Sequence, residues 1–182
     1  MEKKKDIRKG VLAKRNLIPY VEWDKNSDEI SAKVLKQDAF IQADEIYCYI
    51  DFRNEVGTKK IIETAWRMGK KVACPKIVGD VMNFYYIKSY DDLRPGSWGI
   101  LEPVEEALAC GENVLVIMPG AAFDRALHRI GYGKGYYDQY LAKHPDYQTM
   151  ALAFEVQMVE NIPVDKHDIS PQMIITEGHI YV

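Results

Sequence analysis

The chain has 182 residues, of which 47% are hydrophobic, so it is long enough to bury one substantial core. Its 24 Lys and Arg residues against 27 Asp and Glu give a net charge of −3, which argues against nucleic acid or an anionic membrane as a main partner. The start, MEKKKDIRKG, is too charged for a signal peptide, and no apolar run approaches the roughly 20 residues of a membrane span. We therefore expect a single domain over residues 1–182, and nothing in the sequence implies a protein partner.

The cysteines and histidines give no metal-site or disulfide pattern. Cys48, Cys74 and Cys110 are an odd number of widely spaced thiols without a CxxC pair, which suits a reduced, cytoplasmic protein. The histidines likewise lack the spacing of metal ligands; they are His128, His144, His167 and His179.

The first half of the chain predicts helices around one buried strand. Apolar periodicity and composition predict helices over 2–16 and 28–40, a strand over 45–50 and a helix over 58–71. Pro19 follows the end of the first helix, since proline is rarely tolerated inside one. In the last of these helices Thr58 stands at the N-cap position and Gly69 at C′.

The second half predicts most of a sheet. Strands are expected over 71–77, 83–87, 113–119, 149–154, 173–177 and, at an edge, 179–182, with a short helix over 136–143. The run 113–119 is continuously apolar, which is typical of a strand buried on both faces. This alternation predicts a three-layer α/β domain, with a mostly parallel sheet and helices on both faces.

Ligands of such sheets bind at the carboxyl ends of the strands. Three loops follow predicted strands and carry polar residues: 51–57, 119–138 and the segment around 167–168. The basic amino-terminal helix is a fourth candidate, because it can fold back over this edge.

The glycine-rich loop in 129–138, RIGYGKGYYD, is the strongest local motif. Its three glycines allow positive φ and leave backbone N–H groups uncovered, which suits a phosphate. Arg129 can grip phosphate oxygens with its fork, and Lys134 adds a point charge. The spacing is neither GxxxxGK[ST] nor GxGxxG, so a flexible turn is the alternative. The two cations favour the phosphate site.

Other candidate residues have two interpretations each. Asp138 is either an ordinary acid in the first turn of a helix or an Mg²⁺ ligand beside a polyphosphate. Without further context the rest are ordinary surface or packing residues: Lys4, Lys5, Arg8, Glu55, Trp98, His128 and His167.

Five segments, in the same order and over nearly the whole chain, resemble the 5-formyltetrahydrofolate cyclo-ligase family, also called 5,10-methenyltetrahydrofolate synthetases. They are KKDIR, RNEVGT, GSWGILEP, MPGAAFDRALHRIGYGKGYYDQYL, and AFEVQMVENIPVDKHDI with IITE. The fourth is the most specific, because it is similar to Pro-Gly-x-x-Phe-Asp followed by Arg-Leu-Gly-x-Gly-x-Gly-Tyr-Tyr-Asp. One position departs: the family usually has glycine where this chain has Leu127, and leucine is a poor substitute if φ is positive there.

The resemblance implies an ATP- and Mg²⁺-dependent ligase that cyclises 5-formyltetrahydrofolate to 5,10-methenyltetrahydrofolate and releases ADP and phosphate, through a phosphorylated formyl intermediate. It places catalytic charge on Arg129 and Lys134, and Mg²⁺ on Asp138 and Asp168. It places the folate on Ile50, Glu55, Trp98, Tyr132 and Tyr136. It places ATP on Lys4, Lys5, Asp6, Ile7, Arg8, Arg129, Ile130, Gly131, Tyr132, Gly133, Lys134, Gly135, Tyr136 and Tyr137.

Two other classes of function stay open at this point. A phosphosugar isomerase or CoA-transferase-like enzyme on a similar scaffold would need a carboxylate base or nucleophile. A non-catalytic folate- or nucleotide-binding module would need neither. We further expect that replacing Arg129 or Lys134 changes stability little, because loop side chains that face a ligand make few packing contacts.

Overall fold

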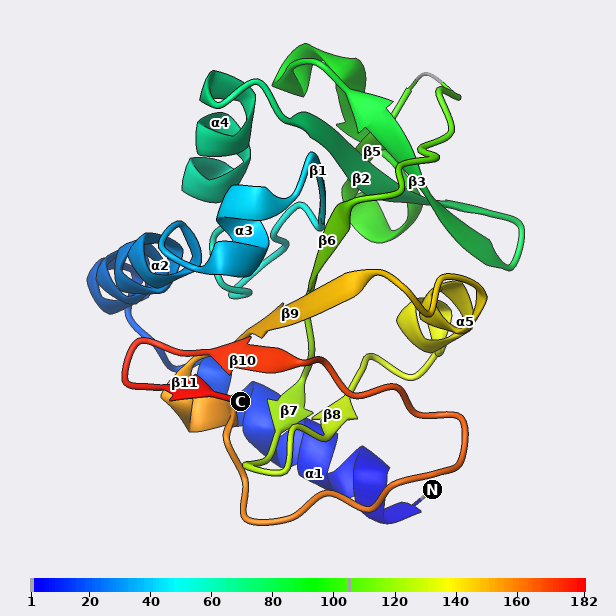
Figure 1. Cartoon of the computed structure of the whole chain (residues 1–182). Helices are drawn as coiled ribbons and strands as arrows, with labels where there is room; N and C mark the ends of the chain where they lie inside the picture. The colour runs from blue at the N-terminus through cyan, green and yellow to red at the C-terminus, as the bar shows by residue number, and fades with distance from the viewer. Residues whose placement is uncertain (1, 105) are drawn as a thin grey trace.

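The computed structural model describes residues 2–104 and 106–182 (Figure 1). At its centre is a seven-stranded sheet in the order β11-β10-β9-β6-β1-β2-β3. The inner strands run parallel to one another: β1 (Glu45–Cys48), β2 (Lys71–Val78), β6 (Val114–Met118), β9 (Gln148–Leu152) and β10 (Met173–Ile175). The two edge strands are antiparallel to their neighbours: β3 (Val81–Ile87) and β11 (Ile180–Tyr181). The predicted mostly parallel α/β sheet is confirmed.

Helices cover both faces of this sheet, as predicted (Figure 1). One face carries α2 (Tyr20–Val34), α3 (Asp38–Gln42) and α4 (Lys59–Arg67), and the other carries α5 (Tyr136–Lys143). Successive side chains of β1 point to opposite faces. Ile46 therefore packs in the cluster that contains Ile62 of α4, and Tyr47 packs in the cluster that contains Leu141 of α5.

A smaller layer joins the amino terminus to the glycine-rich loop. The helix α1 (Glu2–Arg15) lies beside a two-stranded ribbon of β7 (Ala122–Phe123) and β8 (Arg129–Ile130) (Figure 1). Ile7 and Val11 of α1 pack with Ala122 and Ile130 of the ribbon. This apolar contact fixes α1 next to the loop that follows β8.

The helix expected over 28–40 is wrong in its bounds. The observed α2 begins at Tyr20 and ends at Val34, and α3 follows a short turn. Pro19 is the N-cap of α2, a position that needs no intrahelical N–H. Tyr20 and Val21 are exposed, so the first turn of α2 has no apolar periodicity to predict it.

The carboxyl end of α4 is capped as predicted, but its amino end is not. Gly69 has φ of 75°, and its N–H donates to Trp66 O while Lys70 N–H donates to Ala65 O, so it is the predicted C′ residue. Thr58 stands at the N-cap, but its side chain makes no capping hydrogen bond. Its hydroxyl donates to Tyr49 O and thereby ties α4 to the end of β1.

Four short strands were not predicted: β4 (Leu93–Pro95), β5 (Leu101–Pro103), β7 and β8. The hairpin of β4 and β5 lies beside β2 and β3. No helix within the two described ranges is long and apolar enough to cross a membrane.

The strand order reverses at β1. The next strand in the chain, β2, lies on one side of β1, and β6 lies on the other. Connections from the ends of β1 and β6 therefore leave in opposite directions, which opens a crevice at the carboxyl edge of the sheet.

Candidate active site

A largely apolar cavity of about 420 Å³ occupies that crevice. Tyr49 and Ile50 line it directly after β1, and Pro119 lines it directly after β6. Trp98 from the β4–β5 hairpin and Tyr136 from α5 complete its mouth. The planar side chains and the low polarity of this wall suit a flat heteroaromatic ligand.

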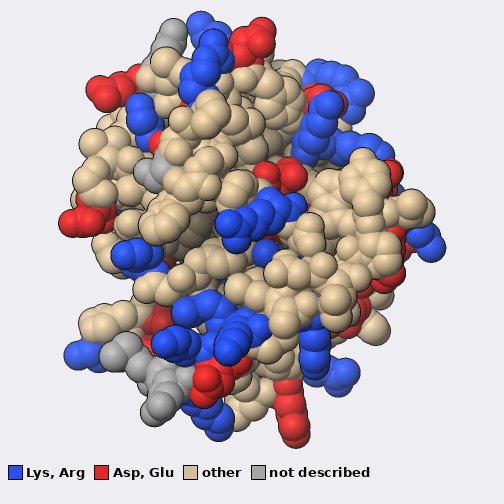
Figure 2. Space-filling model, turned by 180° about the vertical axis from the view of Figure 1, so that it is seen from behind, with Lys and Arg blue, Asp and Glu red and all other residues tan. Residues whose placement is uncertain are grey.

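A second cavity, of about 580 Å³, shares part of its wall with the first but is lined mostly by charged residues and glycines. Lys4, Lys5 and Arg8 of α1 face the glycine-rich loop across it. Four residues line both cavities: Arg129, Gly131, Gly135 and Asp138. Figure 2 shows Lys and Arg side chains gathered next to a hollow on the rear face of the molecule. An anionic ligand in the polar cavity and a flat ligand in the apolar one would meet at the shared wall.

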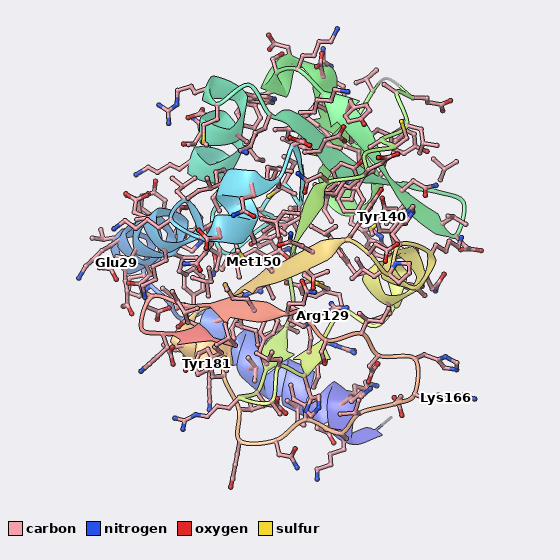
Figure 3. The ribbon with its side chains drawn as sticks, viewed as in Figure 1. Glu29, Arg129, Tyr140, Met150, Lys166 and Tyr181 are labelled. Atoms are coloured by element: carbon pink, nitrogen blue, oxygen red, sulfur yellow. The ribbon has the colours of Figure 1, made fainter. Side chains whose placement is uncertain are left out.

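Arg129 is the buried cation of the shared wall, and Figure 3 marks it near β8, between α5 and α1. Its NH2 donates to Asp138 Oδ1 at 3.1 Å, and its NH1 donates to Pro119 O at 3.3 Å. The Nε atom is buried without a hydrogen-bond partner among the described residues. Only 8% of Arg129 is exposed, so it is not a loosely packed loop side chain, and we now expect its loss to lower stability.

Gly120 leaves the space that the Arg129 side chain and the Phe123 ring occupy. A Cβ there would lie 2.4 Å from the ring of Phe123 and 3.1 Å from Arg129 Cγ, so any other residue would displace the ribbon. The β7–β8 pairing opposes Phe123 to Arg129 and so fixes the backbone that carries the guanidinium.

The glycine-rich loop is held open by α1. Arg8 Nε donates to Gly131 O at 2.9 Å. Gly133 has φ of 105° and Gly135 has φ of 67°, and a Cβ at Gly133 would lie 3.2 Å from Arg8 NH1. Gly135 is also the N-cap of α5. The loop therefore needs glycine for its conformation and for the close approach of an arginine, as a phosphate nest does.

Leu127 adopts the strained conformation that the sequence comparison put in question, with φ of 67°. The buried Asp124 fixes the turn around it: its Oδ1 accepts from Ala126 N and His128 N, each at 3.0 Å. Its Oδ2 accepts from Ile162 N at 2.9 Å and lies 2.9 Å from His128 Nδ1. His128 was expected at the surface, but it is half-buried against Asp124 because it belongs to this turn.

Glu55 lies in the wall of the apolar cavity, in the loop after β1. Its Oε2 accepts from Phe52 N at 2.9 Å, and its carbonyl accepts from Trp23 Nε1 at 2.7 Å. Burial raises the pKa of Glu55, while the Tyr132 hydroxyl, the Phe52 N–H and the Arg15 guanidinium oppose that rise. Glu55 is thus a fixed acceptor whose charge depends on its neighbours.

Asp138 and Asp168 both line the polar cavity, but each is paired with a cation. Asp138 Oδ1 accepts from Arg129 and from Ile169 N, and Asp168 Oδ2 accepts from Lys4 Nζ at 2.5 Å and from Asp165 N at 2.8 Å. The other oxygen of each carboxylate has no hydrogen-bond partner within 2–104 and 106–182. Over the same ranges, no three His, Cys, Asp or Glu side chains are grouped as a metal site.

The structure divides the residues predicted for ATP between the two cavities. Those on the polar cavity are Lys4, Lys5, Arg8, Arg129, Ile130, Gly131, Gly133 and Gly135. Those on the apolar cavity alone are Tyr132, Lys134, Tyr136 and Tyr137. Asp6 and Ile7 line neither cavity: Asp6 is exposed, and Ile7 packs in the cluster under α1. All residues predicted for the folate line the apolar cavity: Ile50, Glu55, Trp98, Tyr132 and Tyr136.

Sequence reasoning missed several residues that build the site. Asp124 and Gln157 are buried and hydrogen-bond the backbone on either side of β7, with Gln157 Nε2 donating to Gly120 O at 2.8 Å. Both lie in segments that resemble the family, Asp124 as the aspartate of Pro-Gly-x-x-Phe-Asp, but the sequence does not show that they hold this backbone. Arg15 could have been found, because it lies seven positions after Arg8 and so on the same face of α1.

Comparison with known proteins agrees with the resemblance of the five segments. The model of the 5-formyltetrahydrofolate cyclo-ligase family matches residues 1–177. A 5-formyltetrahydrofolate cyclo-ligase of Mus musculus is 32% identical over 163 residues, covering 81% of this chain and 80% of the mouse protein. A probable 5-formyltetrahydrofolate cyclo-ligase of Schizosaccharomyces pombe is 31% identical over 172 residues, covering 84% of each. The NMR structure of Aquifex aeolicus 5,10-methenyltetrahydrofolate synthetase is similar with a TM-score of 0.86 and 30% identity, covering 97% of this chain and 91% of that one. The chain belongs to the 5-formyltetrahydrofolate cyclo-ligase family.

Proposed function

We propose that the protein converts 5-formyltetrahydrofolate and ATP into 5,10-methenyltetrahydrofolate, ADP and phosphate. Family membership gives the reaction class. The observation that carries the proposal is the wall that the two cavities share, with Arg129 buried in it. The polar cavity would take the ATP phosphates and the apolar cavity the pterin, so the formyl group and the γ-phosphate would meet beside this guanidinium.

The chemistry explains why two joined sites are needed. The N5-formyl group is an amide, so its carbon is a weak electrophile and its oxygen a poor leaving group. When the formyl oxygen attacks the γ-phosphorus, ADP leaves and that oxygen becomes part of a phosphate ester. N10 then adds to the formyl carbon and loses its proton, and the C–O bond breaks as phosphate leaves. The product is the methenyl bridge between N5 and N10.

The residues of this chain supply position and charge for that sequence. Phosphoryl transfer depends mainly on alignment and on stabilising charge at the equatorial oxygens. Arg129 offers this charge with its Nε still without a partner, and Arg8 and Lys5 add cations across the cavity. Lys134 would reach the phosphate from the apolar side, since it is exposed and lines only that cavity. No side chain has to act as a nucleophile, which sets this reading apart from a phosphosugar isomerase or a CoA transferase.

The folate would be held by the apolar wall and two polar groups. Glu55 can accept from the N–H donors of a pterin ring. The Tyr137 hydroxyl is buried, lines the apolar cavity and has no partner among the described residues, so it is free to donate to the ligand. Burial raises the pKa of Tyr137, which keeps this hydroxyl protonated.

We also propose that Asp138 and Asp168 hold Mg²⁺ with the nucleotide. These two side chains suit Mg²⁺, because the ion prefers hard oxygen donors. Each carboxylate keeps one oxygen that has no hydrogen-bond partner among the described residues. Bound there, Mg²⁺ would neutralise phosphate charge.

The three cysteines are free, which supports a reducing compartment such as the cytoplasm.

Phosphate release is the test of this function. Purified protein with Mg²⁺ and ATP should release phosphate only when 5-formyltetrahydrofolate is added. No release with the folate would contradict the proposal and favour one of the two other classes. Release without the folate would contradict the transfer of phosphate to the formyl group.

A further inference from the structure

Arg15, the last residue of α1, is a buried cation that the site described above does not use directly. Only 5% of it is exposed, and its Nε atom is buried without a hydrogen-bond partner in the described part of the chain. It lines neither cavity. A buried charge costs free energy unless it is compensated, so its position calls for a reason.

Its contact is with the glycine-rich loop. Arg15 NH1 donates to the Tyr132 hydroxyl at 2.9 Å, and the guanidinium carbon lies 6.0 Å from the centre of the Tyr132 ring. On the same face of α1, Arg8 Nε donates to the carbonyl of Gly131. Two arginines of one helix therefore hold two successive residues of the loop, one by its backbone and one by its side chain.

Tyr132 connects Arg15 to Glu55. Tyr132 and Glu55 both line the apolar cavity, and the Tyr132 hydroxyl and the Arg15 charge both lower the pKa of the half-buried Glu55 carboxyl. The other groups that act on this carboxyl are the Phe52 N–H and the titratable side chains of Asp51, Tyr49 and Tyr137. Arg15 is the cation in this set, and the charged side chains of Glu102, Arg129, Lys134 and Asp138 line the same cavity.

We infer that Arg15 is a positioning residue for folate binding, which acts through Tyr132 to hold the loop against α1 and to keep Glu55 a charged acceptor. This inference rests on the proposed function, because it names a further residue of the same site. It predicts a selective defect: the phosphate cavity keeps Arg8 and Arg129 when Arg15 is replaced, so binding of ATP is largely preserved.

The first test compares Michaelis constants in Arg15→Met, Tyr132→Phe and the double variant. Arg15→Met should raise KM for 5-formyltetrahydrofolate about tenfold and KM for ATP by less than about threefold. The double variant should be no worse than Arg15→Met, because both changes break one connection. The control is Lys14→Met, an exposed cation at the preceding position of α1, which should behave as the unmodified protein. Equal increases in both KM values, or additive effects of the two changes, would overturn the inference.

The second test needs no turnover. In ligand-free protein, the ¹³C NMR titration of the Glu55 side-chain carboxyl should give a higher pKa in Arg15→Met than in the unmodified protein or Lys14→Met. An unchanged titration would overturn the inference even if the enzyme is active. If the unmodified protein has no activity but the titration shifts, the proposed function fails while the link between Arg15 and Glu55 stands. Should Arg15→Met not fold, Tyr132→Phe carries the same two measurements.

Discussion

Replacement of Arg129 should lower both kcat/KM and stability, and the structure gives the size of each effect. Arg129→Met keeps the stem that passes Gly120 but removes the guanidinium. Loss of one charge-stabilising donor should lower kcat/KM by roughly 10²–10³. Only 4% of the Arg129 side chain and 20% of the Asp138 side chain are exposed, so solvent replaces the lost ion pair incompletely.

The stability effect follows from that burial. A hydrogen bond to a charged group contributes about 1.5–3 kcal/mol to the free energy of unfolding. Arg129→Met loses that hydrogen bond to Asp138, but it also removes the cost of burying the guanidinium charge, which offsets part of the lost stability. We expect a net loss of about 2 kcal/mol, which lowers Tm by roughly 4–8 °C for a chain of this size. Lys134 is exposed, so Lys134→Ala should lower kcat/KM without a change in Tm.

Product absorbance and thermal unfolding, measured on the same preparations, decide this prediction. Arg125→Met is the matched control, because Arg125 is an exposed arginine in the same loop. Its turnover and Tm should both stay near those of the unmodified protein. If Arg129→Met melts lower but keeps turnover within about threefold, Arg129 is structural and does not touch the transferring phosphate.

Further substitutions test the two cavities. Glu55→Gln should weaken folate binding and leave ATP binding intact in calorimetric titrations. Because the pKa of Glu55 is raised, its carboxyl stabilises the fold when protonated and costs stability as pH rises through that pKa. Glu55→Gln should therefore have a higher Tm than the unmodified protein at pH 8 but not near pH 4. A lower Tm than the unmodified protein at pH 8 would refute this sign. Leu127→Gly should be about 1 kcal/mol more stable to urea than Leu127→Ala, because only glycine relieves the positive φ. Asp138→Asn and Asp168→Asn should each need more Mg²⁺ for half-maximal rate, with non-additive effects; an unchanged requirement in Asp168→Asn would mean that Asp138 acts without it.

The sequence predicted well those elements whose pattern is local. The apolar run at 113–119 fixed the central strand β6, and the short helix 136–143 coincides with α5. Gly69 marked the end of α4 because only a local backbone conformation was at issue. By contrast, α2 begins with exposed residues, so its first turn had no periodicity to detect.

The sequence predicted which loops carry the site residues, but not the contacts that these residues make with distant parts of the chain. Carboxyl ends of parallel strands must lie at one edge, which is why the loops around Glu55, Arg129 and Asp168 could be expected together. The pairing of Lys4 with Asp168 joins residues 164 positions apart, and no local signal reports it. The burial of Arg129 depends on the two-residue strands β7 and β8, which are too short to leave a pattern.

The path of the formyl oxygen tests the central claim most directly, because the joined cavities bring that oxygen to the γ-phosphate. The substrate is 5-formyltetrahydrofolate labelled with ¹⁸O in the formyl group, incubated with the protein, Mg²⁺ and ATP. We predict that one ¹⁸O appears in each inorganic phosphate released, with ADP and the methenyl product formed in equal amounts. Methenyl product formed with unlabelled phosphate, and with the ¹⁸O in water, would contradict phosphoryl transfer to the formyl group at this site.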